Sequence, residues 1–150
     1  MTRMATTDVS ETIACAPERV FELIAHPERH PSWQTDLDTD GIVSGDGRVG
    51  SRGREVRTVM GRSVTSEYEV TDWVANERWG YRSVSGPIQT SGIINCTPVA
   101  GGVRVTATLN FAGWSGEAMS RFARRQFGAH LRALKQLAEG ADAALVRPAE

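Results

Sequence analysis

Two adjoining stretches near the C-terminal end decide the fold of this chain: VRVTATLNF (residues 103–111) and GEAMSRFARRQFGAHLRALKQLAE (residues 116–139). In the first stretch apolar and polar residues alternate, which is the period of a strand with one buried face. In the second, apolar residues recur every three to four positions and most basic residues fall opposite them, which predicts a long amphipathic helix. A strand followed by one such helix predicts that the helix covers a sheet.

The residues before this pair continue the strand period. From about Asp38 to Phe111, apolar and polar residues alternate in short runs. Turn signals that contain glycine separate these runs, at residues 45–47, 60–61, 86–87 and 101–102. Because tight turns join successive strands, we expect an antiparallel meander.

The first part of the chain has a different pattern. A short strand that ends near Ile13 comes first, with the alternation of a half-buried strand. Pro17 then opens a short helix, because a proline at the first helical position loses no hydrogen bond. Residues 26–33 predict a second, very short helix, which Pro31 should kink or stop.

These elements predict one α+β domain over residues 1–150. A curved antiparallel sheet of about seven strands wraps around the long C-terminal α-helix, and two short helices follow the first strand. We expect the core to span about residues 7–139 and the tail, residues 141–150, to fray. One helix is narrower than a sheet of this width, so we also expect a space between the sheet and the helix.

Composition argues against several classes of function. The chain carries 17 basic and 18 acidic side chains, a net charge of −1, so no basic field is present to hold nucleic acid or an anionic membrane. No apolar run approaches the roughly 20 residues of a membrane span, so we expect no stable membrane insertion. The polar segment Met1–Ser10 lacks the apolar core of a signal peptide, so we expect a cytoplasmic protein. Two cysteines, Cys15 and Cys96, are too few for a disulfide framework.

Two patterns resemble metal-binding motifs, but each departs from its motif at a required position. Residues 36–41, DLDTDG, look like the opening of a calcium loop, but Gly47 stands where that loop needs a glutamate. His26 and His30 have the spacing of zinc ligands on a helix, but the glutamate of that motif is displaced and Pro31 distorts the turn. The chain also has no glycine-rich nucleotide loop. We therefore expect no metal and no cofactor.

Three stretches resemble one known superfamily. They are IACAPERVF (residues 13–21), PSW (residues 31–33) and VGSR (residues 49–52), the last with GR (residues 61–62) and SGP (residues 85–87) beyond it. In this order they resemble the SRPBCC superfamily of START, birch-pollen-allergen and bacterial polyketide cyclase/dehydrase-like proteins, over about Thr7 to Glu139. The resemblance implies a helix-grip fold around a deep apolar cavity, with lipids, hormones, flavonoids or polyketides as ligands. Only some members are enzymes, and the resemblance carries over no shared catalytic motif.

His130 is the most informative polar residue. It falls within the apolar face of the terminal helix, so its ring faces the sheet and needs either a hydrogen-bond partner or a ligand. We favour a structural histidine bonded to a strand hydroxyl or carbonyl. The alternative is a catalytic role in proton transfer, for His130 or for Tyr68 or Tyr81. Gln126 lies at the edge of the same helix face.

The strand faces add hydroxyl and aromatic side chains, which line a cavity if those faces are concave. For any one of them we favour ordinary core packing over contact with a ligand. Trp33 is expected near the cavity mouth if the second short helix acts as a lid, and packed beneath that helix if it does not. The predicted ligand-binding residues are Trp33, Ser66, Tyr68, Trp79, Tyr81, Ser83, Leu109, Phe111, Phe122, Gln126, His130 and Leu134.

Arg57 and Glu55 share one face of a predicted strand. An inward arginine could steady an enolate as a fixed positive charge. We favour instead a solvated face on which Arg57 pairs across the sheet with Glu67 or Glu69.

These observations predict a protein that binds a hydrophobic or aromatic small molecule, lipid- or polyketide-like, between the sheet and the C-terminal helix. We expect a monomer or a homodimer. A polyketide aromatase/cyclase or dehydratase that acts in the same cavity is the first alternative. A non-enzymatic interaction module with a filled interior is the second.

Overall fold

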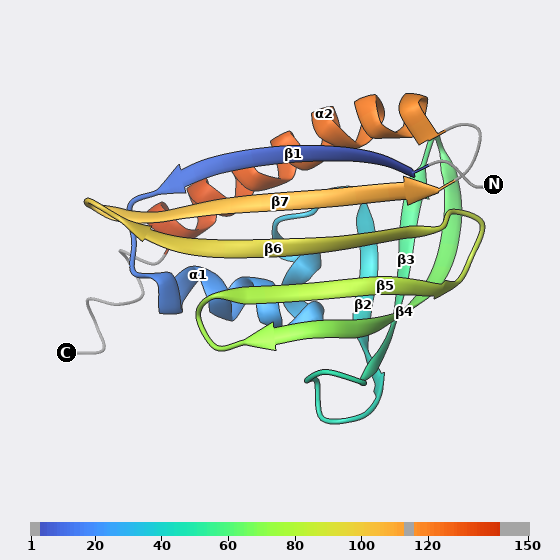
Figure 1. Ribbon diagram of the computed structural model, residues 1–150, viewed down its shortest axis with the longest axis horizontal. Coiled ribbons are helices and arrows are strands. Elements are labelled where there is room, and N and C mark those ends of the chain that lie inside the picture. Colours follow the sequence, from blue (N-terminus) through green and yellow to red (C-terminus); the bar gives the residue numbers. More distant parts are fainter. Residues whose placement is uncertain (1–3, 113–115, 142–150) are drawn as a thin grey trace.

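The computed structural model describes residues 4–112 and 116–141, and one antiparallel sheet dominates them (Figure 1). Its strands are β1 (Met4–Ile13), β2 (Leu37–Ser44), β3 (Arg52–Val59), β4 (Arg62–Val74), β5 (Arg78–Ser85), β6 (Thr90–Val99) and β7 (Gly102–Ala112). The helices are α1 (Pro17–Ala25), the 3-10 helix η1 (Pro27–Ser32), α2 (Gly116–Gln136) and the π-helical turn η2 (Leu137–Ala141). The tail that we expect to fray lies outside the described residues, apart from its first residue.

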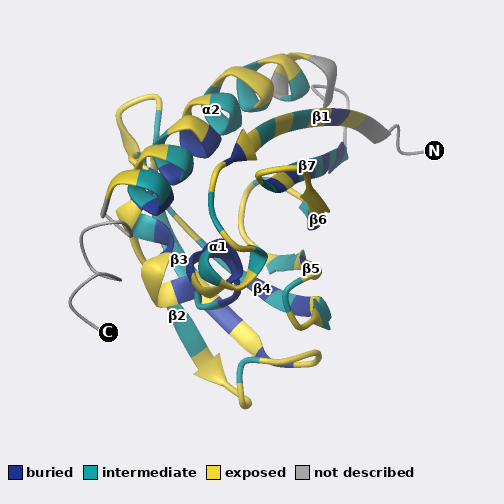
Figure 2. Ribbon diagram, turned by 90° about the vertical axis from the view of Figure 1, so that its left-hand side faces the viewer, coloured by how far each residue is buried: buried dark blue, intermediate teal, exposed yellow. Residues whose placement is uncertain are grey.

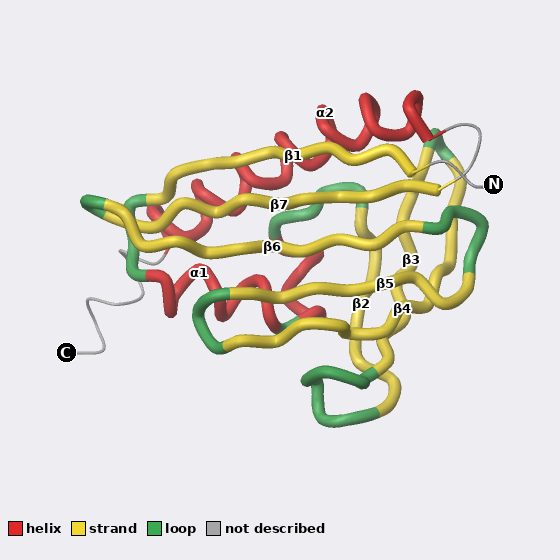
Figure 3. Tube along the Cα trace, viewed as in Figure 1, coloured by secondary structure: helices red, strands yellow, loops and turns green. Residues whose placement is uncertain are grey.

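The sheet has the strand order β1-β7-β6-β5-β4-β3-β2, and every neighbouring pair is antiparallel. Strands β2 to β7 form the expected meander. β1 pairs with β7 and forms one edge of the sheet, where Ile13 pairs with Val103. Figure 3 shows α2 as the long helix that runs beside β1 and β7. The seven strands of the described residues and the C-terminal helix confirm the predicted helix-grip fold.

The half of the sheet that contains β2, β3 and β4 is strongly bent. Register shifts interrupt β2, and two more interrupt β4 where it pairs with β5, one between Glu67 and Tyr68 and one between Val70 and Asp72. Such bulges bend a strand and increase its twist. A β-carbon at Gly53 of β3 would lie 2.2 Å from Cζ of Tyr68, so the Tyr68 ring occupies the space that a side chain would need. The sheet is therefore concave on one face, and α2 lies over that face (Figure 2).

The second half of α2 is tied to β1 and to the residues that follow it. Nζ of Lys135 donates a hydrogen bond to the carbonyl oxygen of Thr12 at 3.0 Å. The backbone N–H of Ala14 donates to the carboxylate of Glu139 at 2.7 Å. The regular α-helix ends at Gln136, slightly before its predicted end, and continues as the π-helical turn. None of the helices within the described ranges is long and apolar enough to cross a membrane.

The two short helices α1 and η1 pack against the hydrophobic core. α1 buries an apolar face that includes Phe21 and Ile24. The expected second short helix is the 3-10 helix η1, with Pro31 inside it. Trp33 follows it, is fully buried, and donates its Nε1 proton to the carbonyl oxygen of Leu23 at 3.0 Å. This hydrogen bond holds the end of η1 against α1.

Candidate ligand-binding cavity

A cavity of about 170 Å³ lies between the concave face of the sheet and α2. Its described lining residues come from η1 and the segment after it, from each of the strands β2 to β7, and from residues 122–130 of α2. Most of the wall is apolar or aromatic, with a small set of charged and hydroxyl side chains. For scale, an apolar cavity of about 150 Å³ in an engineered protein holds a benzene molecule.

The structure brings most of the residues singled out in the sequence to this cavity. Trp33 and Leu134 are the exceptions, because both are fully buried in the core and neither is among the described lining residues. Trp33 packs beneath η1 and not at the mouth, while Leu134 lies in the last turns of α2, beyond the lining residues, and is buried in the core. The ten others line the cavity: Ser66, Tyr68, Trp79, Tyr81, Ser83, Leu109, Phe111, Phe122, Gln126 and His130.

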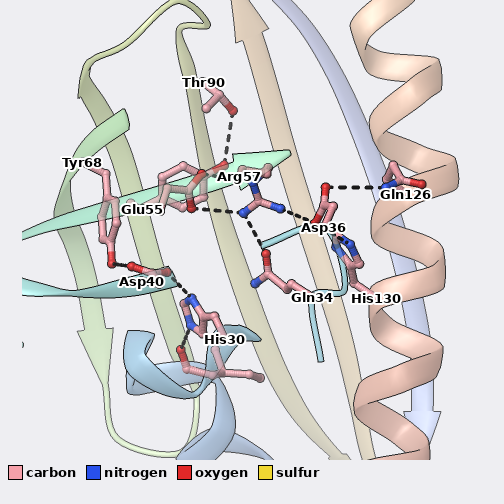
Figure 4. A network of polar contacts seen from close by, with 12 residues as sticks. His30, Gln34, Asp36, Asp40, Glu55, Arg57, Tyr68, Thr90, Gln126 and His130 are labelled. Atoms are coloured by element: carbon pink, nitrogen blue, oxygen red, sulfur yellow. Dashed lines mark hydrogen bonds and ion pairs between the residues drawn. The ribbon is translucent and has the colours of Figure 1, made fainter. Parts of the chain in front are cut away.

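The first polar cluster of the cavity is centred on Arg57. Its guanidinium lies 2.8 Å from Oδ1 of Asp36, 3.0 Å from Oε1 of Glu55 and 2.9 Å from Oε1 of Gln34 (Figure 4). Burial acts to lower the pKa of Arg57, but the charge and hydrogen bonds of Glu55 and the charge of Asp36 raise it above its ordinary value. Arg57 is therefore charged, and it fixes both carboxylates by charge-assisted hydrogen bonds.

The expectation of a solvated face for Arg57 and Glu55 is wrong. Both side chains line the cavity, and Glu67 pairs with Arg54 on the other face of β3. A period of two identifies residues that share a face but does not say which face is inward. The charges of Arg57 and Glu55 suggest a face in contact with solvent. Inside the cavity, however, Asp36, from the segment before β2, supplies a carboxylate that pairs with Arg57.

His130 extends from α2 toward Asp36 (Figure 4). Its side chain is 2% exposed, and its Nε2 lies 3.0 Å from Oδ1 of Asp36. The direction of this contact falls outside hydrogen-bond geometry, so neither ring nitrogen of His130 has a hydrogen-bond partner among the described residues. The expected strand hydroxyl or carbonyl is not its partner. Burial acts to raise the pKa of Asp36, but the contact with His130 and the charge of Arg57 outweigh it and hold that pKa below its usual value.

The second polar cluster joins η1, β2 and β4. Nε2 of His30 lies 2.7 Å from the carbonyl oxygen of Ile24, and Nδ1 lies 2.9 Å from Oδ2 of Asp40. Tyr68 donates its hydroxyl proton to Oδ1 of Asp40 at 2.7 Å. Burial first, and then the charge of Asp40, raise the pKa of Tyr68 well above its ordinary value. Each ring nitrogen of His30 and each carboxylate oxygen of Asp40 thus has a partner.

Aromatic rings connect the two clusters. Trp79 lies 5.2 Å from His30, 6.3 Å from Tyr68 and 5.9 Å from Tyr81, measured between ring centroids. The hydroxyl of Tyr81 lies 3.2 Å from Oγ1 of Thr90, and burial raises the pKa of Tyr81. Nε1 of Trp79 is buried without a hydrogen-bond partner among the described residues. Aromatic rings therefore form much of this wall, and one of them carries an unpaired donor.

Sequence patterns alone do not identify His30, Gln34, Asp36 and Asp40 as cavity residues. They present the two aspartates only as an incomplete calcium loop, and His30 only as an incomplete zinc motif. The alternation of a strand is no guide here, because it would place Asp38 on the same face as Asp36 and Asp40. Asp38 is exposed, since a register shift between Leu37 and Thr39 interrupts the alternation. Among the residues that the structure describes, no group of three or more His, Cys, Asp or Glu side chains is placed to hold a metal ion.

The fold with its helix-covered sheet is shared with known proteins. Solved structures similar to this chain include the Zhui aromatase/cyclase from Streptomyces sp. R1128, with 19% identity, a TM-score of 0.78, and coverage of 91% of this chain and 94% of that one. A START superfamily protein from Mycobacterium smegmatis has 17% identity, a TM-score of 0.76, and coverage of 91% and 97%. A protein from Thermus thermophilus has 21% identity, a TM-score of 0.78, and coverage of 91% and 99%.

At these identities the solved structures show the fold alone. No curated protein matches the sequence. The model of one family, described as polyketide cyclase/dehydrase and lipid transport, matches residues 4–139. Since this match spans the whole helix-grip domain, the chain belongs to the polyketide cyclase/dehydrase and lipid transport family, within the SRPBCC superfamily that its sequence resembles.

Proposed function

We propose that the protein binds an aromatic or otherwise hydrophobic small molecule between the sheet and α2. The observation that carries this proposal is the cavity of about 170 Å³ with its largely apolar wall and few polar groups. Small-molecule sites have this composition, because apolar walls supply affinity and a few polar groups fix orientation. Burial of a few hundred Å² of ligand gives several kcal/mol at about 25 cal/mol/Å² before entropy losses, which suffices for roughly micromolar affinity.

The aromatic wall supports a ring-containing ligand that carries oxygen. Trp79 and Tyr81 lie with their ring planes 31° apart and offer a broad apolar surface for stacking. The unpaired Nε1 donor of Trp79 lacks a partner among the described residues of the protein. A buried donor without a partner costs about 1–3 kcal/mol, and a carbonyl or ether oxygen of the ligand recovers part of that cost.

Two measurements test the binding of such a molecule. Native mass spectrometry of freshly purified protein detects a hydrophobic compound that co-purifies with it. Calorimetric titration with 2-naphthol tests the cavity directly, with Ala123→Phe as the variant that fills it, because Ala123 lines the cavity from α2. Ala118→Phe is the matched control, at an exposed position of the same helix.

We expect 2-naphthol to bind the wild type and the Ala118→Phe variant equally, and to lose most of its affinity for Ala123→Phe. Equal affinity for all three proteins places the ligand outside the cavity and overturns the proposal. The interior of the domain is not filled, and a filled interior is what the alternative of an interaction module requires.

A reaction in the same cavity is the second candidate, of the aromatase/cyclase or dehydratase type. The contact of His130 with Asp36, beside the charged Arg57, favours it. In such a reaction His130 takes a proton from a methylene group between two carbonyls. The enolate carbon then bonds to another carbonyl carbon of the same molecule, and the alkoxide takes the proton back. Loss of a second proton and of hydroxide, together as water, forms the double bond, while Arg57 stabilises the enolate charge.

The reaction is tested with a synthetic linear 1,3-polyketone, followed by the absorbance of the aromatic product. We expect His130→Ala to lose turnover while the protein retains affinity for 2-methoxynaphthalene, which offers no hydroxyl to His130. If the wild type is no faster than buffer, this second candidate is removed and ligand binding remains.

A further inference from the structure

Two buried histidines line the cavity, and only one of them is hydrogen-bonded within the described residues. His30 has an oxygen partner at each ring nitrogen. His130 is as deeply buried, yet neither of its ring nitrogens has a hydrogen-bond partner in the described part of the chain. Buried polar atoms without partners are uncommon because they lose their bonds to water and gain none in the protein. The wall that α2 provides therefore contains a polar ring with unused hydrogen-bonding capacity.

Asp36 decides which nitrogen of His130 carries the proton. Its carboxylate accepts a hydrogen bond from Nη1 of Arg57 at 2.8 Å, and Nε2 of Gln126 lies 3.5 Å from its other oxygen. Nε2 of His130 lies 3.0 Å from the oxygen that Arg57 contacts. The negative charge of the carboxylate attracts an N–H group and repels a lone pair at this distance, so the proton of a neutral ring belongs on Nε2 even without a well-directed hydrogen bond. Nδ1 then carries a lone pair and is an acceptor.

We propose that Nδ1 of His130 accepts a hydrogen bond from a hydroxyl group of the ligand, so that the cavity selects phenols and enols over the corresponding ethers. Asp36 is the positioning residue that keeps the proton on Nε2, and Arg57 holds Asp36. This inference rests on the proposed binding function and names the chemical group by which the ligand is recognised.

Matched ligands test the acceptor. 2-Naphthol and 2-methoxynaphthalene share their rings and their oxygen, but only 2-naphthol can donate a hydrogen bond. Because the two compounds differ in hydrophobicity, the ratio of their affinities is compared between proteins. We expect the ratio to fall about two- to tenfold in His130→Phe, the range for the loss of one hydrogen bond. His26→Phe, which changes a histidine outside the cavity lining, is the matched control and keeps the wild-type ratio.

Asp36→Asn tests the positioning role separately. An asparagine side chain can present its carbonyl oxygen or its amide group to His130, so it no longer restricts the proton to Nε2. We expect the preference for 2-naphthol to fall as in His130→Phe, while 2-methoxynaphthalene still binds. Nitrogen-15 NMR of the ring nitrogens, assigned by the loss of signals in His130→Phe, reports the tautomer directly. The free wild type should show the proton on Nε2.

The outcomes separate this inference from the proposed function. A proton on Nδ1 in the wild type overturns the acceptor role, and so does an unchanged affinity ratio in His130→Phe, while both leave ligand binding intact. If neither naphthalene binds the wild type, the proposed function fails together with the inference. Should His130→Phe not fold, the same comparison is carried by Asp36→Asn, and His130→Gln takes its place in the assignment of the NMR signals.

Discussion

His30 and His130 line the same cavity, each beside an aspartate, but their surroundings are opposite. Both ring nitrogens of His30 face oxygen atoms, and Trp79 packs edge-on against its ring. His130 contacts Asp36 through one nitrogen without a well-directed hydrogen bond, and Phe127 packs against its ring at 5.3 Å. The two residues are equally buried, so burial alone does not distinguish their roles.

This difference indicates two roles: His30 holds its neighbours in place, and His130 is available to a ligand. A buried polar side chain with all its partners in the protein holds its neighbours in place, and its removal leaves those partners unsatisfied. A buried polar side chain without partners costs stability in the free protein and is useful when a ligand supplies the missing bond. By this reasoning the wall formed by η1, β2 and β4 supports the cavity, and the wall formed by α2 makes contact with its occupant.

The largest effect expected from this division is the loss of stability in His30→Ala. The substitution leaves the carboxylate of Asp40, whose side chain is 1% exposed, with only the Tyr68 hydroxyl as its partner among the described residues. Removing a buried ring together with a hydrogen-bond partner of a buried carboxylate costs about 3–5 kcal/mol, measured as the free energy of unfolding in urea. His26→Ala is the control, because His26 is half-buried and its ring contacts the carbonyl oxygen of Glu22. Equal losses in the two variants would show that Asp40 does not need His30.

The contrast between closed and open packing is tested by two leucines. Leu134 lies in the last turns of α2 and is fully buried, so Leu134→Ala should cost about 2–5 kcal/mol, toward the upper end of that range. Leu109 lines the cavity, where one side of its packing is already missing. Leu109→Ala should therefore cost less, by about 1 kcal/mol or more, in the same urea titration. A larger loss for Leu109 than for Leu134 contradicts an open cavity beside β7.

The tyrosines extend the comparison to alkaline pH. Tyr68 and Tyr81 are the two tyrosines of the chain, and burial raises the pKa of both. In the unfolded chain each ionises near pH 10, whereas the folded protein keeps the protons. The stabilisation is therefore complete below about pH 10 and is lost above it, at about 1.4 kcal/mol per tyrosine for each pH unit. We expect tyrosinate absorbance to appear only as circular dichroism reports unfolding. Tyrosinate formed near pH 10 in a folded protein would place the rings in contact with solvent.

The fold could be predicted from the sequence because its signals are local. The alternation in residues 103–111, the turn residues and the apolar face of residues 116–139 each act over a few positions. Short turns then make neighbouring strands pair, which leaves few topologies for the sheet.

The polar part of the cavity could not be predicted in the same way. Arg57 finds its partners Asp36 and Gln34 more than 20 residues away, across the bend of the sheet. A helix pattern also assigns Leu134 and His130 to the same face, although of the two only His130 is among the described lining residues of the cavity. Whether an inward residue packs or lines a cavity depends on what stands opposite, and periodicity carries no information about that.

The smallest effect is expected for the stability of His130→Phe. This variant also tests most directly whether His130 supports the wall or contacts the ligand. A phenyl ring of similar size keeps the packing with Phe127 and removes two nitrogens that have no hydrogen bond within the described residues. Asp36 keeps its ion pair with Arg57, so no carboxylate is left alone. Replacing unsatisfied polar atoms by apolar ones is close to neutral or stabilising, so we expect a change within about 1 kcal/mol in the free energy of unfolding, measured in urea. A loss of more than about 2 kcal/mol would mean that the contact with Asp36 is a structural bond of the same kind as that between His30 and Asp40. In that case the ring on α2 supports the wall, and its nitrogens are not reserved for a ligand.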